Sequence, residues 1–550
     1  MKGVISLKRI FKTGVALALS LSLLSSQLIW AGVNTAEAAG KKVKNVIMMI
    51  PDGMSVDGTT LARWYNGGQP LAMDEMACGL VRTYSSDAAI ADSAPAGSAF
   101  ATGYKSHTGY VATLPEVANM PGLRPITEED KNRPVATILE AAKLAGKATG
   151  VISTSETMHA TPADFTAHST SRKAYDDLSE QQVYNNVDVV LGAGWKFMDG
   201  NNRKDKTDLI SVIKNKGYDY VTTPAALQAS KSNKIWGLFA PEALAYEMDR
   251  DPAKEPSLAE MTGKAINVLS QDKDGFFLMV EGSKVDWAAH ANDPVGVISD
   301  ILAFDKAVKV ALDFAKKDKN TVVIAVTDHG NGGLTIGDAG TTKTYDEEPL
   351  ATFINPLKKA KLTGEGIESK LNADRSNIKE VMATYFGITD LTEAEIAAIK
   401  AAKPGSMNYA VGPIISKRAH IGWTTGGHTG EDVVLYVYAP NGVDRLTGVV
   451  ENTDIAKYME EVLGLSLTDA TKKLFVDANA AFKAKGASVE LKDSGNNNMV
   501  LVVKKGATTL ELPINTNIAR MGDKKVELSG VIVYNGGRTF VPQDAVSLIN

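Results

Sequence analysis

Short apolar runs that end in polar, chemically capable residues recur along this chain, and helical stretches separate them. Two such runs are KNVIMMIPDG (44–53) and NTVVIAVTDHG (320–330), while apolar residues recur at helical spacing in 133–147 and 297–317. Strands that alternate with helices favour an α/β fold. We therefore expect a large, mostly parallel central sheet flanked by helices. Ligands of such sheets bind beyond the carboxyl ends of the strands, so we expect the chemistry there.

The chain begins with a pattern typical of a secretory signal peptide. Four basic residues in the first twelve positions precede the apolar run GVALALSLSLLSSQLIW, and AEAAG follows it. We assign residues 1–38 to a signal peptide cleaved near Ala38, which predicts a secreted, extracellular or cell-surface protein. The run is near the lower limit for spanning a bilayer, so a retained membrane anchor is the alternative.

The remaining length, out of 550 residues, is too great for one simple core. We predict a catalytic domain over 39–465, in which the less regular stretch 340–420 forms an insertion near the site. Residues 466–486 are polar and rich in lysine and alanine, as in a linker helix. The sequence pattern then changes to short β-type runs broken by turn residues, which predicts a small β-rich accessory domain over 487–550.

Charge and cysteine content limit the classes of partner and site. The formal net charge of -5 gives no support to a nucleic-acid partner. Cys78 is the only cysteine, so an exported chain of this sequence has no internal disulfide. Any metal site must then use histidines and carboxylates, and the chain has only seven histidines.

Several segments offer such ligands at strand ends or in adjoining loops. Each segment alone is weak evidence, because Asp-containing turns and solvated surface histidines are common. Together they provide enough carboxylate and imidazole groups for two or three divalent ions, which suits two-metal chemistry on phosphate esters. The candidates are Asp52, Glu281, the helically spaced pair Asp286 and His290, the adjacent pair Asp328 and His329, and His428.

The stretch ADSAPAGSAFATG (91–103) consists almost entirely of small residues. Ser93 precedes a segment that can be helical up to Gly103, and a helix N-terminus is a natural phosphate site. The alternative is that Ser93 is simply a helix N-cap. A serine hydroxyl needs a base or a metal to become a good nucleophile. Arg172 could grip two phosphate oxygens with its planar fork, or be an ordinary surface residue. Ser98 has no role beyond packing.

With these motifs, the sequence closely resembles the alkaline phosphatase family. The matching motifs are IPDGM, DSAPAGSAFATGYK, HATPADF with TSRKAY, VEGSKVDWAAH, TDHGNGG and GGHTGED, which come in the family's order over roughly residues 43–465. The resemblance implies a metal-dependent phosphomonoester hydrolase that acts through a phosphoserine in two in-line displacements. It implies Ser93 as nucleophile and Arg172 as phosphate clamp.

The same resemblance implies three metal ions and their ligands. Asp286, His290 and His428 look like ligands of one zinc ion. Asp52, Asp328 and His329 look like ligands of a second, and Asp52 would also contact a third ion, expected to be magnesium, with Thr161 and Glu281.

Two positions near the third metal and the phosphate vary within the family. His159 stands where some bacterial members have aspartate, and Trp287 stands where those members have lysine. Both changes remove charged groups. We therefore expect weaker or altered occupancy of the third site and weaker retention of product phosphate.

Alternatives remain at the level of function and partners. A phosphodiesterase of the same superfamily could use the same ions. A sulfatase is less favoured, because Ser93 and Pro95 match the start of that signature but Gly97 stands where it has arginine. A non-catalytic surface protein is the third alternative. The tail resembles the copper amine oxidase N-terminal-like domain but has no histidine, so we expect a stabilising or wall-associating module rather than a copper site. The family resemblance leaves a homodimer open and does not identify the physiological monoester.

Overall fold

The computed structural model describes residues 41–549. The predicted signal peptide, 1–38, therefore lies outside the described residues. Within residues 41–549, no helix combines the length and the apolar character needed to cross a bilayer.

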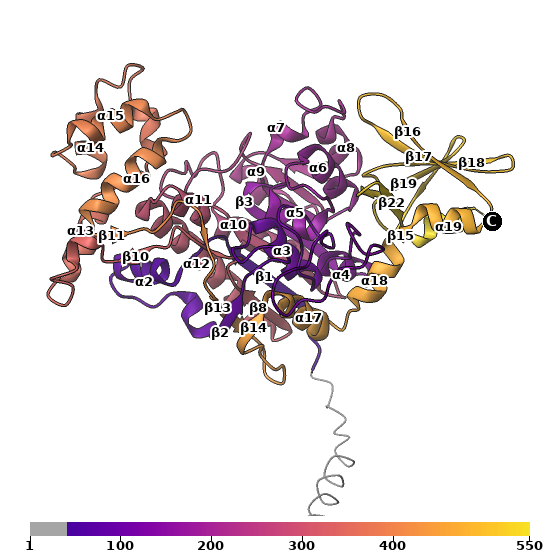
Figure 1. Cartoon of the computed structure of the whole chain (residues 1–550), viewed down its shortest axis with the longest axis horizontal. Helices are drawn as coiled ribbons and strands as arrows, with labels where there is room; N and C mark the ends of the chain where they lie inside the picture. Colours follow the sequence, from indigo (N-terminus) through magenta and orange to yellow (C-terminus); the bar gives the residue numbers. More distant parts are fainter. Residues whose placement is uncertain (1–40, 550) are drawn as a thin grey trace, which may run out of the picture. The chain divides into compact units, whose positions relative to one another are not determined.

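A ten-stranded sheet forms the centre of the fold (Figure 1). All its strands run parallel except β13, which is antiparallel to both of its neighbours. This arrangement confirms the predicted α/β fold with a mostly parallel sheet. In spatial order the strands are β14 (Gly448–Glu451), β2 (Ala77–Arg82), β13 (Val433–Tyr438), β8 (Thr321–Ala325), β1 (Asn45–Pro51), β7 (Phe276–Gly282), β3 (Ala148–Glu156), β4 (Val189–Ala193), β6 (Ile235–Leu238) and β5 (Asp219–Val221).

The central strand β1 shows why the sheet is buried on both faces. All seven residues of NVIMMIP are buried, as expected for a parallel strand covered by helices on each side. Side chains alternate along a strand, so Ile47 and Met49 enter one hydrophobic cluster while Met48 and Ile50 enter another. The two clusters lie on opposite faces of the sheet.

Helices cover both clusters. The long helix α12 (Pro294–Asp318) packs on the first face with α10 (Leu258–Leu269) and α2 (Val56–Tyr65). The second face is covered by α3 (Ser93–Thr102), α4 (Ile138–Leu144), α5 (Ala160–Thr166), α6 (Tyr175–Tyr184) and α17 (Asn452–Leu463). The shorter helices α7 (Trp195–Met198), α8 (Leu209–Asn215) and α9 (Pro224–Ala229) lie between the strands of the β4–β6–β5 edge in the sequence.

The stretch 340–420 is mostly helical. Its short helices are separated by turns rich in proline, glycine and polar residues, which explains why the sequence shows no long periodic pattern. The α-helices are α13 (Leu350–Lys358), α14 (Ile378–Phe386), α15 (Glu393–Ala401) and α16 (Met407–Arg418).

The C-terminal module consists of residues 476–549 and has its own hydrophobic cluster. A five-stranded antiparallel sheet runs in sequence order: β16 (Ser488–Asp493), β17 (Met499–Lys505), β18 (Thr508–Pro513), β19 (Ile518–Met521) and β20 (Lys524–Glu527). A smaller sheet joins β15 (Val476–Asp477), β22 (Arg538–Val541) and β21 (Val533–Asn535), and two helices, α19 (Ala478–Ala484) and α20 (Gln543–Ser547), complete the module. The β-rich character predicted for this end of the chain is confirmed.

The segment predicted as a linker forms two helices, α18 (Leu467–Leu474) and α19, whose contacts differ. Leu474 of α18 belongs to the second-face cluster of the large sheet, whereas Phe482 of α19 belongs to the cluster of the C-terminal module. Phe540 of β22 also enters the second-face cluster. The division of the chain at 465 and 487 stays a prediction.

Candidate active site

Ser93 is the first residue of helix α3, and Asp92 occupies its N-cap. The N-cap alternative for Ser93 is therefore wrong. All ten residues of α3 are buried, and the helix ends at Gly103, whose φ of 79° completes a left-handed cap. The hydroxyl oxygen of Ser93 lies 3.2 Å from Nε2 of His329. A buried serine at a helix start thus faces a histidine from the end of a central strand.

The small residues of α3 let it pack tightly on α5. A Cβ atom on Gly97 would lie 2.3 Å from Oδ2 of Asp164, so a larger residue would clash. The Ser98 hydroxyl donates to Oδ1 of Asp164 at 2.8 Å and accepts from the backbone N–H of Ala112 at 2.7 Å. Ser98 therefore ties α3 to α5 and to a neighbouring loop, a positioning role beyond the packing role expected from the sequence.

Three carboxylates meet where three adjacent strands, β8, β1 and β7, reach their carboxyl ends. Asp52 follows β1, Glu281 lies near the end of β7, and Asp328 follows β8; all three are fully buried. Gly53, at φ 66°, allows the close approach of the next ligand segment, because a Cβ there would lie 2.7 Å from Oδ1 of Asp286. The sheet itself brings these acids together.

These buried acids lack the hydrogen bonds that such groups normally have. Within the described part of the chain, no hydrogen-bond partner is found for five atoms: both carboxylate oxygens of Asp52, Oδ2 of Asp328, Oε1 of Glu281 and Oγ1 of Thr161. Burial and the repulsion of Asp328 raise the pKa of Asp52 well above its usual range. Burial also raises the pKa of Glu281 to about 7, although hydrogen bonds from Ser153 and Ser283 lower the pKa in part. Such an arrangement is costly for the protein alone and fits divalent cations, which take oxygen ligands.

His428 reaches the site through a short strand pair. Strand β12 (His428–Thr429) pairs antiparallel with β9 (Gly330–Asn331), so His428 lies opposite Asn331, two residues after His329. The rings of His329 and His428 stack with centroids 3.6 Å apart. Asn331 donates to Oδ1 of Asp286 at 2.6 Å. The pairing therefore joins the segment after β8 to the His428 loop.

Two histidines direct ring nitrogens at one place beside Asp286. Nδ1 of His290 lies 2.8 Å from the carbonyl oxygen of Gly426, and Nδ1 of His428 lies 2.8 Å from that of Ala91. A carbonyl oxygen only accepts, so each Nδ1 carries the hydrogen, and in a neutral ring Nε2 then has a lone pair. The two Nε2 atoms lie 3.2 Å apart.

The ligand atoms fall into two overlapping groups. Oxygens of Asp286 lie 3.4 Å from Nε2 of His290 and 3.6 Å from Nε2 of His428. Asp286 also groups with Asp52 and His329, and Asp328 Oδ2 lies 3.2 Å from Nε2 of His329. Carboxylate and imidazole ligands supported by second hydrogen bonds fit zinc.

Arg172 enters the site from the turn before α6. Its backbone N–H donates to the carbonyl of Gly109 at 2.7 Å. Its guanidinium pairs with Asp92 and donates to Nε2 of His159 at 3.1 Å. A guanidinium has five N–H donors in a fixed fork, more than these two contacts use, so one next to Ser93 suits the oxygens of a phosphoryl group.

His159 and Trp287 lie together behind Arg172. Burial and the neighbouring Arg172 lower the pKa of His159 to about 3, so the ring is neutral and accepts from the arginine. The rings of His159 and Trp287 meet edge to face with centroids 6.0 Å apart. Two uncharged rings therefore stand at the positions singled out in the sequence.

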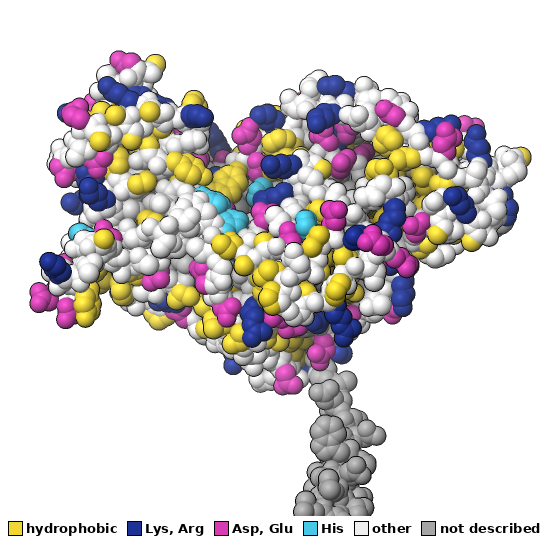
Figure 2. Space-filling view, viewed as in Figure 1, with side chains coloured by type: hydrophobic (Ala, Val, Ile, Leu, Met, Phe, Trp, Pro, Cys, Tyr) yellow, Lys and Arg dark blue, Asp and Glu magenta, His cyan; other side chains and the backbone are white. Residues whose placement is uncertain are grey.

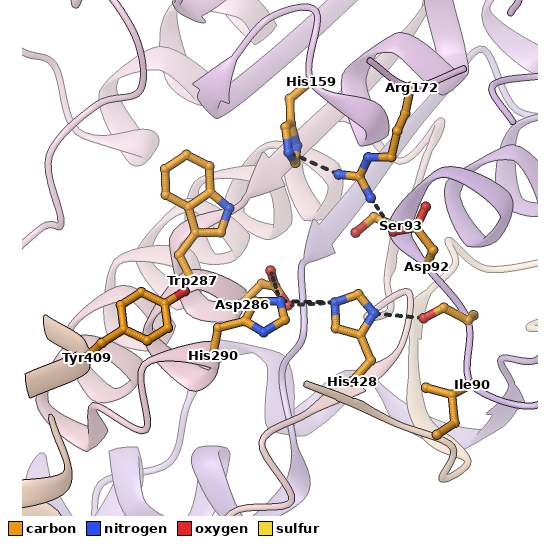
Figure 3. Close-up of a pocket in the computed structure, with 11 residues that line it drawn as sticks. Ile90, Asp92, Ser93, His159, Arg172, Asp286, Trp287, His290, Tyr409 and His428 are labelled. Atoms are coloured by element: carbon orange, nitrogen blue, oxygen red, sulfur yellow. Dashed lines mark hydrogen bonds and ion pairs between the residues drawn. The ribbon is translucent and has the colours of Figure 1, made fainter. Parts of the chain in front are cut away.

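A cavity of about 640 Å³ opens in front of Ser93. Figure 2 shows histidine side chains in a hollow of this face, with hydrophobic side chains adjoining them. Figure 3 shows the lining: Asp92, Ser93, His159, Arg172, Asp286, His290 and His428, together with Ile90, Ala91, Trp287 and Tyr409.

The structure brings every candidate site residue into one region. Ser93, Arg172, Asp286, His290, His428, His159 and Trp287 line the cavity, while Asp52, Asp328, His329, Glu281 and Thr161 are buried. Sequence reasoning gave no role to Asp92, Asn331 or Tyr409. Asp92 and Asn331 lie within two of the quoted motifs, DSAPAGSAFATGYK and TDHGNGG, which is a signal that could have been used. Tyr409 has none, since it comes from helix α16, outside every quoted motif.

Comparison with known proteins identifies two family matches. The alkaline phosphatase family model matches residues 43–465, and the copper amine oxidase N-terminal domain model matches residues 467–549. The chain is 38% identical to alkaline phosphatase 3 of Bacillus subtilis (strain 168), over 83% of this chain and 98% of the relative.

Two solved structures extend the comparison. The alkaline phosphatase of Thermus thermophilus is 28% identical, with a TM-score of 0.69, over 79% of this chain and 95% of that one. A mutant of the TAB5 alkaline phosphatase, in which aspartate replaces a histidine and Mg is bound in the M3 site, is 26% identical, with a TM-score of 0.56, over 78% of this chain and 99% of that one. TAB5 is an Antarctic bacterium.

Proposed function

The chain belongs to the alkaline phosphatase family, and from that premise we propose that it hydrolyses phosphate monoesters through a phosphoserine on Ser93. One observation carries the proposal. Ser93 lies at the start of α3 within reach of Arg172, of His329 and of two groups of metal-binding side chains. This combination supplies a nucleophile, a phosphate clamp and sites for cations.

The donor atoms support a three-ion assignment. Asp286, His290 and His428 would hold one zinc ion, Asp52, Asp328 and His329 a second, and Asp52, Thr161 and Glu281 a magnesium ion. Bound there, such ions lower the pKa of an attacking hydroxyl or water and stabilise the negative charge of the transition state.

The chain's own residues provide binding, orientation and the nucleophile. Arg172 binds two oxygens of the phosphoryl group and holds phosphorus in front of Ser93. The Ser93 hydroxyl loses its proton as its oxygen forms a bond to phosphorus, the bond between phosphorus and the ester oxygen breaks, and the departing alkoxide takes up a proton to leave as the alcohol. Water then attacks the phosphoserine from the opened side, which releases phosphate and restores the hydroxyl. Asp92 orients the guanidinium through the ion pair between them.

The test is to trap the phosphoserine. The full chain, supplied with zinc and magnesium, is incubated with a ³²P-labelled monoester, quenched in acid and digested, and the labelled peptide is identified. We expect label on Ser93 and, in Ser93→Ala, no label and a loss of kcat of roughly a thousandfold or more. Ser98→Ala, on the same helix but bonded away from the cavity, should still be labelled. Full activity of Ser93→Ala would overturn the proposal.

Comparing a monoester, a diester and a sulfate ester separates the proposal from its alternatives. The proposal predicts the highest kcat/KM for the monoester. Preference for the diester would favour a phosphodiesterase, and preference for the sulfate ester would favour a sulfatase.

Occupancy of the third site by magnesium is also a proposal for this chain. The TAB5 mutant that holds Mg in its M3 site carries aspartate in place of a histidine. Mg²⁺ prefers oxygen ligands, so we expect the imidazole of His159, with Trp287 nearby, to weaken the third site. Metal analysis and phosphate inhibition of His159→Asp and Trp287→Lys test it; values equal to those of the parent would contradict it.

Export and surface retention are further proposals. Residues 1–38 would direct the chain to export and be cleaved off near Ala38, and the C-terminal module would associate with the cell wall or stabilise the enzyme. N-terminal sequencing of the mature protein tests the first. Comparing cell-bound and released activity of module variants tests the second.

A further inference from the structure

The cavity is divided into a charged side and an aromatic side. Ser93, Asp92 and Arg172 stand on one side of the view in Figure 3, and Trp287 and Tyr409 stand on the other. All five line the same cavity. At about 640 Å³, it falls within the range of pockets that bury whole organic ligands. The space beyond the phosphoryl site is therefore available to the rest of the substrate.

Trp287 is a fixed wall of this space. The ammonium of Lys284, a buried residue, lies 4.2 Å from the centroid of the indole, and the ring of His159 meets it edge to face. A cation over one ring face and an aromatic edge restrain the indole without covering it completely. Trp287 is half-buried, so it still presents apolar surface to the cavity.

Tyr409 adds a second ring from another part of the chain. It lies on helix α16 and is 54% exposed although it lines the cavity. No hydrogen bond of its hydroxyl is found among the described residues. Ile90, 51% exposed, lines the cavity on the side of Ser93 and Asp92 (Figure 3). Exposed apolar side chains gathered at one cavity are typical of a ligand-binding surface.

We propose that Trp287 and Tyr409 form a subsite for the organic group of the substrate and select phosphate monoesters whose alcohol carries a planar aromatic ring. The inference rests on the phosphatase function proposed above and names a substrate class for it. Flat aromatic groups gain more from stacking on such rings than small alkyl groups do. The charged side of the cavity holds the phosphoryl group of either kind of ester.

Binding of phosphonates tests the subsite without the reactivity of a leaving group. Phenylphosphonate, methylphosphonate and inorganic phosphate are titrated calorimetrically into the full chain loaded with zinc and magnesium. We expect phenylphosphonate to bind about three- to tenfold more tightly than methylphosphonate. In Tyr409→Ala this ratio should fall to about one to two, whereas Tyr409→Phe should keep it.

Tyr345→Ala is the matched control, because Tyr345 lies in the same stretch, 340–420, is 74% exposed and is not among the residues that line the cavity. It should keep the parent ratio. Equal binding of the two phosphonates by the parent, or an unchanged ratio in Tyr409→Ala, would overturn the subsite while leaving the phosphatase proposal standing. Failure of all three anions to bind would count against both.

Discussion

The carboxyl end of the central sheet and the core of the C-terminal module are both buried, but they bury opposite kinds of side chain. Around Asp52 the chain gathers buried carboxylates, several of whose oxygens have no hydrogen-bond partner among residues 41–549. Around Phe482 it gathers apolar side chains such as Leu510 and Ile532. Burial of unpaired charge opposes folding and burial of apolar surface drives it. The strand-end cluster thus opposes folding unless its charge is compensated, whereas the core of the module favours folding.

The first prediction tests the module side of this contrast. Phe482 is fully buried in the module's cluster, so Phe482→Ala should cost about 3–5 kcal/mol of local stability. Hydrogen exchange across β16–β20 measures that loss, and Phe482→Leu should show a smaller one. The kcat/KM for a monoester should not change. A fall in kcat/KM while the large sheet stays folded would break the contrast.

Substitution of Arg172 should do the reverse, weakening ligand binding without lowering stability. Arg172→Ala removes two charge-assisted hydrogen bonds to the phosphoryl group, which should raise the dissociation constant of phosphate roughly ten- to hundredfold. Arg172→Lys keeps the charge without the planar fork and should lie in between. Calorimetry measures the affinity for phosphate, and thermal unfolding measures the stability of each variant. Unchanged phosphate affinity would remove Arg172 from the site.

Asp52 tests whether the strand-end cluster lowers stability when cations are removed. In chelator, Asp52→Asn should raise the free energy of unfolding by about 1–3 kcal/mol, because one buried carboxylate no longer faces Asp328. Zinc should stabilise the parent more than the variant.

Asp164→Asn is the control for that experiment. Asp164 is also buried with an unpartnered oxygen, but it lies outside the proposed ligand groups. Its effect on unfolding should be the same with and without zinc. A less stable Asp52→Asn in chelator would show that the cluster does not oppose folding.

The smallest expected effect concerns the contact between the two regions. Asn515 of the module donates to Asp177 and accepts from Gln181, and Gln181 holds the backbone of His168, four residues before Arg172. Asn515→Gly keeps the positive φ of 66° but loses both bonds, which should cost about 1–2 kcal/mol. Faster hydrogen exchange in 168–172 is expected. Unchanged exchange there would mean that the module does not support the arginine turn.

Much of the fold could be predicted because its signals are local. The buried runs around Met48 and Val323 are near-continuous apolar segments, which parallel strands between helix layers require. The short helices of 350–418 were not predicted, since none is long enough to show a sustained period. Their packing on the first-face cluster, as at Ile354 and Val411, comes from the tertiary structure.

The sequence by itself determined the α/β architecture, the family and a set of chemically capable residues. Strand periodicity, turn residues and motif order can all be read from the order of residues in the chain. Only the tertiary structure decided which of these groups meet. It placed His428 against His329 through a two-residue strand pair, gave Ser98 a partner in Asp164, and carried Tyr409 to the cavity. Such contacts join residues far apart in sequence, and they form only when packed helices and strands fix their positions.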